Sequence, residues 1–283
     1  MSEHGSTVRR RAIGKALRAV REEAGYSLAA ASRHVERSAS SLSIIENGGQ
    51  LLRPRDLNFI LDSYEVDPGL RATLLTLTKQ EQQTGWWNEF RDITSLDDRD
   101  YVSLENSASR LSGIYTQSIP GLLQTEEYTR SIMRASLFEN DPRRAERYVG
   151  FRMARQRVLR SPAPPQLHVI IDEAALRRVR SEPGVMSDQL QHLLDRSRDE
   201  HVTIQVLSFS SAAAVTHNGT FAIVEVGAPS TLSVVLVDRL TKRISIEDAE
   251  EIDRFHVAFR QTVPVALSPH DSRIMIEEVA SQL

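Results

Sequence analysis

The sequence predicts a mainly α-helical protein with an α/β C-terminal part: a domain of five short helices followed by a larger α+β or α/β domain. Apolar residues recur with helical spacing in the first part of the chain and with strand-like spacing after residue 166. Between these parts, Gly85 and a pair of tryptophans interrupt the helical pattern. We therefore expect two domains, residues 1–84 and 85–283.

Composition and charge narrow the class of protein. A 283-residue chain with 40% hydrophobic and 26% charged residues is typical of a soluble globular protein, and the absence of Cys excludes disulfides and thiolate metal sites. Through Arg55 there are ten Lys or Arg against five Glu (+5), and the remainder has 25 basic against 33 acidic residues (−8). A basic first fifth on an acidic body indicates a nucleic-acid-binding head. With no signal core and no membrane-length apolar run, we expect a cytoplasmic protein that does not enter membranes.

Five helices are expected before Gly85. Residues 12–24 are expected to form an amphipathic helix that ends at Gly25. Ser27 can cap a second helix, and Ser38 can cap a third helix that ends at Gly48. The fourth and fifth begin at prolines, Pro54 and Pro68. Ahead of the first helix, Arg9–Arg11 form either a basic arm on DNA or a disordered start.

The second part mixes helices and strands. Two helical segments between Tyr101 and Ala135 are expected to flank a turn in SIPGLLQT, and a basic helix follows over 143–160. A strand, helices and a second strand then predict a βαβ unit. The expected ranges are strands 167–172, 202–209, 221–227 and 232–238, and helices 173–179, 186–200, 247–261 and 269–282.

The segment SASSLSIIENG carries a specific family pattern. Its residues Ser38, Ser41, Leu42, Ser43, Ile45, Glu46, Asn47 and Gly48 resemble the helix-turn-helix of the phage-repressor-like (XRE/Cro) regulators. The resemblance extends over about residues 11–77 and implies a helix that enters the major groove of double-stranded DNA with its N-terminal turns.

Two departures from the family pattern concern the turn before this helix and the start of the helix. Glu36 and Arg37 replace the usual Gly and apolar residue, where a left-handed Glu costs roughly 1–2 kcal/mol. Ala39 replaces a Gln or Arg.

The recognition helix has to be slim and able to hydrogen-bond base edges or phosphate. The base-contact candidates are Ala39, Ser40, Ser43 and Ile44, while Leu42 and Ile45 face the core. Specificity then depends on a methyl contact from Ile44, on DNA shape or on dimer spacing. The phosphate-contact candidates are Ser27, Arg33, Arg37, Ser38, Asn47, Arg53 and Arg55, each arginine being alternatively a solvated surface charge. A protein-interaction module that has lost DNA binding is the alternative for the whole segment.

From Trp86 onward the chain resembles the DUF5753 family of regulators in high-GC Gram-positive bacteria. The matching segments are YVSLENSASRLSGIYTQSIPGLLQTEEYTRSI, RMARQ, IIDEAALRR, QLQHLLD and VTIQVL. The resemblance implies a regulator often paired with a small DUF397-type protein, as in antitoxin–toxin arrangements. It implies no fixed chemistry.

Other chemistry has weaker support. Asp172 with Glu173, and Glu105, could be paired carboxylates, but an acidic helix start is favoured. The eight His lack HxH or HExxH spacing and no nucleotide-binding or nucleophile motif occurs, so no metal, cofactor or catalysis is expected. Five aromatic residues could line an effector pocket or a groove for a partner protein: Trp86, Trp87, Tyr101, Tyr115 and Phe151. The alternative is that they belong to the core of the domain.

Together these patterns predict a homodimeric, sequence-specific transcription regulator controlled through its C-terminal domain by a small protein or ligand. The first alternative is an antitoxin-like protein that binds a DUF397-type partner and uses DNA binding for autoregulation. The second is an enzyme or small-molecule sensor with a DNA-targeting head.

Overall fold

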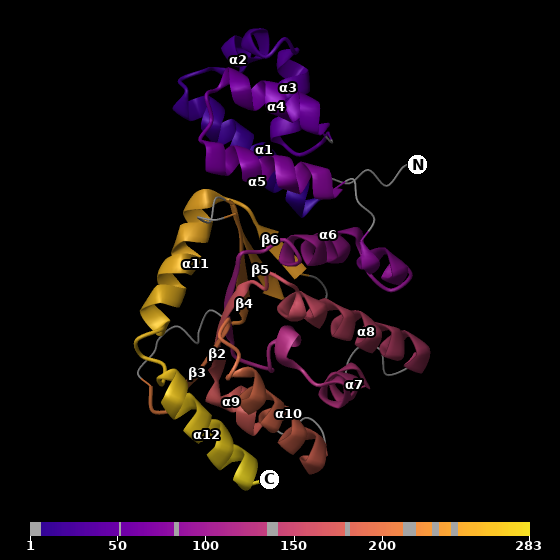
Figure 1. Cartoon of the computed structure of the whole chain (residues 1–283), viewed down its shortest axis with the longest axis vertical. Helices are drawn as coiled ribbons and strands as arrows, with labels where there is room; N and C mark the ends of the chain where they lie inside the picture. Colours follow the sequence, from indigo (N-terminus) through magenta and orange to yellow (C-terminus); the bar gives the residue numbers. More distant parts are fainter. Residues whose placement is uncertain are drawn as a thin grey trace. The chain divides into compact units, whose positions relative to one another are not determined.

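The chain divides into two compact units. The computed structural model describes residues 7–50, 52–81, 85–134, 141–178, 182–211, 219–227, 232–238 and 243–283. Contacts between Cα atoms group Met1–Ser109, Val224–Val235 and Ser245–Ile252 into unit 1, and Arg110–Ile223, Leu236–Ile244 and Asp253–Leu283 into unit 2 (Figure 1). The domain boundary at 84/85 stays a prediction. Within the described segments, no helix combines the length and apolar character needed to cross a bilayer.

Unit 1 begins with the five predicted helices, which we call the head. They are α1 (Val8–Glu23), α2 (Leu28–His34), α3 (Ala39–Glu46), α4 (Pro54–Ser63) and α5 (Pro68–Glu81). Thr7, Ser27 and Ser38 cap the first three, each accepting a backbone N–H from the first turn of its helix. The head core is fully buried at Leu17, Leu42, Leu57, Ile60, Leu61 and Leu74. The predicted capping and apolar spacing are therefore confirmed.

The start of α1 corrects the expectation for Arg9–Arg11. Arg9 is 1% exposed; its backbone N–H donates to Asp100 Oδ2 at 2.7 Å, and its guanidinium donates to Leu77 O and Ser103 Oγ. Both readings, basic arm and disordered start, are wrong because α1 begins at Val8. The early N–H groups of a helix need acceptors, and the Asp100 carboxylate supplies one from a distant segment.

Arg11 has a comparable role on the same helix. Its Nη2 lies 2.9 Å from Glu247 Oε1 and donates to Ser245 Oγ at 2.9 Å. Asp100 and Ser103 belong to α6 (Leu96–Glu105), which Ser95 and Asp98 start with a capping box. The short helix η1 (Trp86–Phe90) precedes α6. All these residues are in unit 1, so α1 is part of a structure that extends beyond the head.

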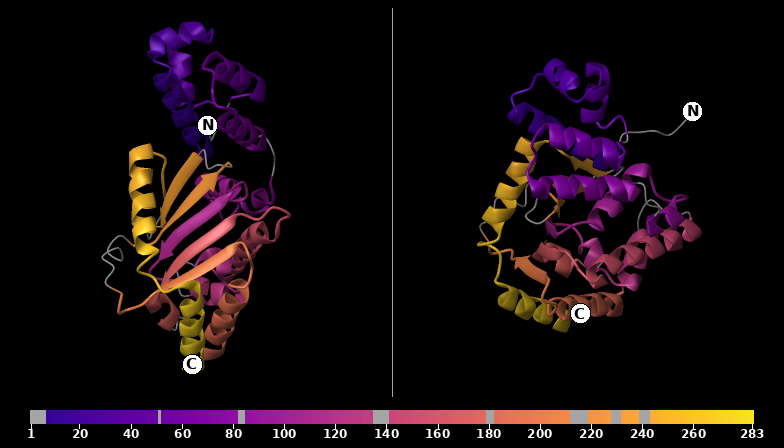
Figure 2. Two further views of the ribbon diagram at one scale, coloured as in Figure 1. Left: turned by 60° about the vertical axis from the view of Figure 1, so that its left-hand side comes forward. Right: turned by 45° about the horizontal axis from the view of Figure 1, so that its top comes forward.

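Within the described residues, the sheet contains six strands in the order β3-β2-β1-β4-β5-β6 (Figure 2). Their bounds are β1 (Arg110–Tyr115), β2 (Gln166–Asp172), β3 (Val202–Leu207), β4 (Phe221–Val226), β5 (Leu232–Asp238) and β6 (Arg243–Ile246). β1, β2 and β3 are parallel, with Leu111 opposite Leu167 and Leu167 opposite Val202. The Ser109 N–H donates to Glu225 O, and the Thr116 N–H donates to Thr220 Oγ1. The start of β1 therefore lies beside the end of β4, so the two strands are antiparallel. The sheet is mixed.

Strand β1 corrects the prediction of a helix in this segment. The run Leu111–Ile114 is buried, and a Cβ on Gly113 would lie 2.6 Å from Phe221 O. That glycine therefore lets β1 and β4 approach closely. SIPGLLQT joins β1 to α7 through η2 (Gly121–Leu123) rather than joining two helices. β6 was not predicted either.

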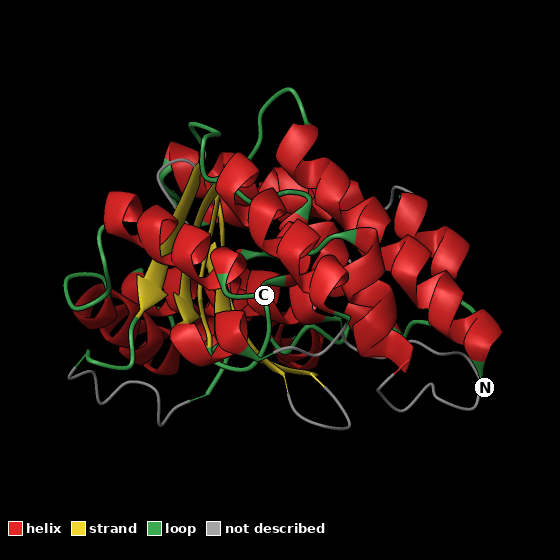
Figure 3. Cartoon of the chain, turned by 90° about the horizontal axis from the view of Figure 1, so that it is seen from below, coloured by secondary structure: helices red, strands yellow, loops and turns green. Residues whose placement is uncertain are grey.

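The predicted βαβ unit is confirmed by β2, α9 (Glu173–Arg177), α10 (Pro183–Arg196) and β3. The other helices are α7 (Glu126–Arg134), α8 (Pro142–Arg155), η3 (Gln156–Arg160), α11 (Ala249–Thr262) and α12 (Pro269–Ser281). α12 packs against β3, α9 and α10, and α7 against α8 and α10. The strands lie among helices, as the secondary-structure colours of Figure 3 show.

Candidate nucleic-acid interface

The turn between α2 and α3 has a left-handed residue, as the sequence predicted. Glu36 has φ 52°, and the adjoining Arg37 N–H donates to Ser32 O at 2.8 Å. Val35, just before it, is 1% exposed and belongs to the head core. A non-glycine residue in this conformation costs roughly 1–2 kcal/mol, which the buried neighbour offsets. The turn therefore holds α2 and α3 as a helix-turn-helix.

α3 separates its core side from its outer side. Leu42 and Ile45 are 0% and 2% exposed, whereas Ile44 is 47% exposed. Ser40 is exposed, and Ala39 and Ser43 are partly exposed. Positions 39, 40, 43 and 44 share one helical face by their spacing. The structure therefore brings the four base-contact candidates together on the outer face of α3.

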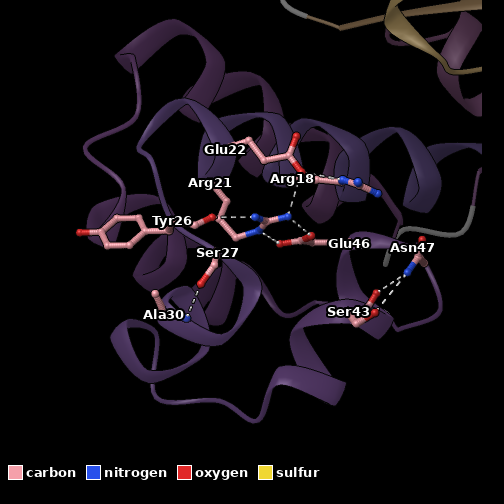
Figure 4. A network of polar contacts seen from close by, with 9 residues as sticks. All are labelled: Arg18, Arg21, Glu22, Tyr26, Ser27, Ala30, Ser43, Glu46 and Asn47. Atoms are coloured by element: carbon pink, nitrogen blue, oxygen red, sulfur yellow. Dashed lines mark hydrogen bonds and ion pairs between the residues drawn. The ribbon is translucent and has the colours of Figure 1, made fainter.

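A buried ion pair fixes α3 against α1. Arg21 Nε and Nη2 donate to the two Glu46 carboxylate oxygens at 2.7 and 3.0 Å, with both side chains under 8% exposed (Figure 4). Arg21 Nη1 also donates to Tyr26 O at 2.8 Å, which ties in the start of α2. The bond to Glu46 raises the pKa of Arg21, against the lowering effect of burial. This bidentate pair holds α3 by its C-terminal end.

Gly14 allows the close contact between α1 and α3. A Cβ at Gly14 would lie 2.5 Å from Glu46 O and 2.6 Å from Ile45 O. In the sequence Glu46 stands out only as part of the family pattern, and its role in this contact was not predicted. One signal was available: Glu46 lies four residues after the core residue Leu42, where a carboxylate needs a buried partner.

Several phosphate-contact candidates already have structural roles. Asn47 Nδ2 donates to Ser43 O at 2.8 Å and lies 3.4 Å from Ser43 Oγ, next to Gly48 at φ 70° (Figure 4). Ser27 Oγ and Ser38 Oγ accept the N–H groups of Ala30 and Ser41 as helix caps. Asn47 thus closes α3, while the serines start α2 and α3. Their contacts with phosphate stay predictions.

The arginine candidates differ in exposure. Arg33, Arg53 and Arg55 are exposed, and Arg53 is the N-cap residue of α4. Arg37 is partly buried, with Nη2 3.5 Å from Asp56 Oδ2. An exposed arginine can approach a phosphate at little desolvation cost. The three exposed residues are therefore better placed for the predicted role than Arg37.

The aromatic candidates for an effector or partner site fall into different units. Trp86, Trp87 and Tyr101 are in unit 1, and Tyr115 and Phe151 in unit 2. Tyr101 is buried and donates to Glu105 Oε2 at 2.6 Å, and Phe151 is 3% exposed. Trp86, Trp87 and Tyr115 are partly exposed. A pocket lined by all five stays a prediction, and Tyr101 and Phe151 act as core residues.

The candidate carboxylate pair is engaged in helix and loop contacts. Asp172 Oδ1 accepts the Ala174 N–H as the N-cap of α9. Glu173 is 6% exposed, pairs with Arg177 and accepts the Phe209 N–H at 2.8 Å. These bonds agree with the interpretation of an acidic helix start.

Comparison with known families matches both parts of the chain. A model described as a helix-turn-helix domain matches residues 12–74, and one described as a domain of unknown function (DUF5753) matches residues 98–278. Neither curated proteins nor solved structures return a match. The helix-turn-helix match agrees with the capped α2–turn–α3 geometry and indicates a DNA-binding regulator. Because the second match covers more than half of the sequence, the chain belongs to the DUF5753 family, with a helix-turn-helix domain preceding the family region.

Proposed function

We propose that the protein is a sequence-specific transcription regulator that inserts α3 into the major groove of DNA. The observation that carries this proposal is the outer face of α3, where Ser40, Ser43 and Ile44 are accessible while Leu42 and Ile45 are buried. Small hydroxyl side chains let the helix enter the groove and hydrogen-bond base edges, and Ile44 can contact a thymine methyl group. The Arg21–Glu46 pair supplies the rigid mount that such docking requires.

The proposed regulator acts as a homodimer. Hydroxyl and methyl contacts discriminate bases less than a bidentate Gln or Arg would, since the latter contributes ~1–3 kcal/mol per base. Two heads on half-sites about one DNA turn apart, roughly 34 Å, double the number of base contacts. A palindromic target is therefore part of the proposal.

Control is proposed to reside in the DUF5753 region, which binds a small protein partner or a ligand. What supports this is the join between α1 and α6 inside unit 1, where Arg9 bonds Asp100 and Ser103. Asp100 and Ser103 lie within the matched range 98–278, whereas Arg9 precedes the helix-turn-helix match. A displacement of α6 would therefore act on the helix against which α3 packs.

The test is a binding selection with the full-length protein on random and genomic DNA fragments, comparing wild type with Ser43→Glu. We expect a short palindrome to be enriched by wild type and lost in the variant, because a carboxylate would face base edges and phosphates. Ala72→Glu adds the same charge at an exposed position of α5 and should leave enrichment unchanged. Equal enrichment by wild type and Ser43→Glu would reject the assignment of α3. The selection is then repeated with a co-purifying small protein.

A further inference from the structure

The positive charge of unit 2 is concentrated on one helix. Unit 2 has 21 Lys or Arg against 17 Asp or Glu, a net +4, whereas unit 1 has 14 against 21, a net −7. The excess of acid that follows Arg55 in the sequence therefore lies in unit 1. In unit 2, α8 and η3 contain seven arginines and a single acidic residue, Glu146. This helix thus supplies a third of the basic residues of unit 2.

Exposed arginines lie along one side of this helix. α8 ends at the residue before η3 begins, so the two form a continuous helical segment. The arginine face, as we call it, consists of four exposed residues: Arg143, Arg147, Arg157 and Arg160. With about 3.6 residues per α-helical turn and about 3 per 3₁₀ turn, they fall within roughly 40° of one another around the axis. The rise per residue gives the face a length of about 28 Å.

The charge of the arginine face is available to a partner outside the chain. The only acidic residue of α8, Glu146, is already engaged, because its Oε1 accepts Arg130 Nε from α7 at 2.8 Å. Within the described part of the chain, the side chains of Arg143, Arg157 and Arg160 form no ion pair and no hydrogen bond. Exposed guanidinium groups can approach an anion at little desolvation cost.

The chemistry of this side of the helix favours a nucleic-acid backbone over a protein. In α8 and η3, no large apolar residue is exposed, and the partly buried Tyr148 and Met153 pack inward against the core that α8 shares with α7. Between the two pairs of arginines the face has only Gly150, which is exposed, and Ala154, which is 6% exposed. Protein interfaces need an apolar or aromatic centre, whereas contacts with phosphate need only charge and hydrogen-bond donors.

We propose that the arginine face of α8 and η3 binds the phosphate backbone of double-stranded DNA, as a second contact in addition to the head. Guanidinium groups bind phosphate through paired N–H donors and keep their charge at neutral pH. A duplex carries one negative charge per ~1.7 Å of its axis, so a face of about 28 Å can meet a phosphate with each arginine. Such contacts carry no base information and strengthen binding to any sequence. The inference goes beyond the proposed role of α3 and does not require it.

Binding to a duplex of unselected sequence at several salt concentrations tests the arginine face. The parent is the full-length Ser43→Glu protein, in which α3 contributes little, and fluorescence anisotropy gives the affinity. Replacing both Arg143 and Arg147 by Gln should weaken binding at least fivefold at low salt and reduce the slope of log K against log salt by about 1.8. Replacing Arg157 and Arg160 by Gln should have the same effect. Absence of binding by the parent, or equal slopes for the parent and both double variants, would overturn the proposal.

The matched control removes two exposed arginines from another helix of unit 2. Arg254 and Arg260 lie in α11, on the other side of the sheet from α8 (Figures 1 and 2). Arg254→Gln combined with Arg260→Gln changes the net charge equally and should leave the slope unchanged. A reduction as large as that of the arginine-face variants would show a general charge effect and overturn the proposal. Because the parent carries Ser43→Glu, these results do not depend on whether α3 reads bases.

The absence of Cys from the sequence allows the contact to be mapped directly. Gly150→Cys places a single thiol between the arginine pairs, and Arg260→Cys places one on α11. With a photo-cross-linking label on the thiol, we expect cross-links to the duplex from position 150 and not from position 260; equal yields would count against the contact. Labelled poly-glutamate serves as the probe for an acidic protein. If the double variants lost poly-glutamate binding and kept DNA binding, the face would belong to a protein partner and the proposal would be wrong.

Discussion

Single side chains in the head either hold α3 in place or lie on its outer face. Arg21 and Glu46 are buried together, and Asn47 bonds the end of its own helix. Ile44, although apolar, is 47% exposed at the centre of the serine-rich face. Burial therefore separates the structural residues of the family pattern from those available to bases. The same criterion favours Arg53 over Arg37 as a phosphate contact.

Arg53→Ala is expected to weaken binding to all DNA sequences to a similar extent. Arg53 is exposed at the start of α4, and loss of one phosphate contact should reduce the slope of log K against log salt by about 0.9. Fluorescence anisotropy at several salt concentrations measures the slope. Arg91→Ala, at an exposed position outside the five helices, should change nothing. A loss confined to one base position would contradict the phosphate role.

Tyr64→Phe is expected to change stability at alkaline pH. Burial first, and then the negative charge of Glu46, raise the pKa of Tyr64 to about 12, and its hydroxyl has no hydrogen-bond partner among the described residues. The folded state thus keeps the proton that the unfolded chain releases near pH 10. The contribution of Tyr64 to the free energy of unfolding is complete below pH 10. It falls by up to roughly 2–3 kcal/mol as the pH rises from 10 to about 12.

Urea unfolding of wild type and Tyr64→Phe across pH 8–11.5 isolates this contribution. The variant should lack the extra alkaline loss and be at least as stable at pH 8, since no hydrogen bond is removed. Identical alkaline slopes for wild type and Tyr64→Phe would show that Tyr64 ionises normally.

The helices of the head are defined by local chemistry at their ends. Ser27 and Ser38 supply caps, Pro54 and Pro68 open α4 and α5, and Gly48 ends the segment after α3. The α2–α3 turn departs from this pattern because Glu36 adopts a left-handed conformation. Packing of the adjoining Val35 therefore imposes the turn on a residue that does not favour it.

Glu36→Gly is expected to stabilise the protein by about 0.5–1 kcal/mol. Glycine relieves roughly 1–2 kcal/mol of strain and loses part of that gain through the greater freedom of the unfolded chain. Glu36→Ala keeps the strain and should show no gain. Chemical denaturation of the three proteins measures the difference. If the alanine variant gained as much as the glycine variant, backbone strain would not be the cause.

At the scale of the whole molecule, the contact units do not follow the matched family ranges. Unit 1 extends to Ser109 and includes 245–252, so Arg9 and Arg11 of α1 bond Asp100 and Glu247 of the DUF5753 range. A head on a free linker would lose these bonds. The stability of α1 therefore depends on residues far along the chain.

Asp100→Ala is expected to lower the free energy of unfolding by about 1–3 kcal/mol, because it removes the acceptor of the buried Arg9 backbone N–H. Asp97→Ala removes an exposed carboxylate from the first turn of α6 and should cost no more than about 0.5 kcal/mol. Urea unfolding followed by circular dichroism compares the two. Similar small losses would mean that α1 folds independently of α6.

Local patterns were sufficient to predict the five head helices, the βαβ unit and the exposed face of α3. Caps, prolines and the 3.6-residue period act within a few residues of each other, so they are visible in the sequence. The short apolar run of β1 was wrongly predicted to be helical, because periodicity alone does not separate a short buried strand from a helix. The pairing of β1 with β2 and the proximity of Gly113 to Phe221 distinguish them.

The sequence by itself determined the family, the helix-turn-helix and which residues of α3 face outward. Tertiary structure alone decided the Arg21–Glu46 mount, the bonding of Arg9 and Arg11 to distant acids, and the bond between Arg152 and Gln124. The physical reason is common to all three. The effect of a charged side chain on stability depends on the groups within a few ångströms of it. Folding brings these groups together from positions that are 25 to 236 residues apart in the sequence.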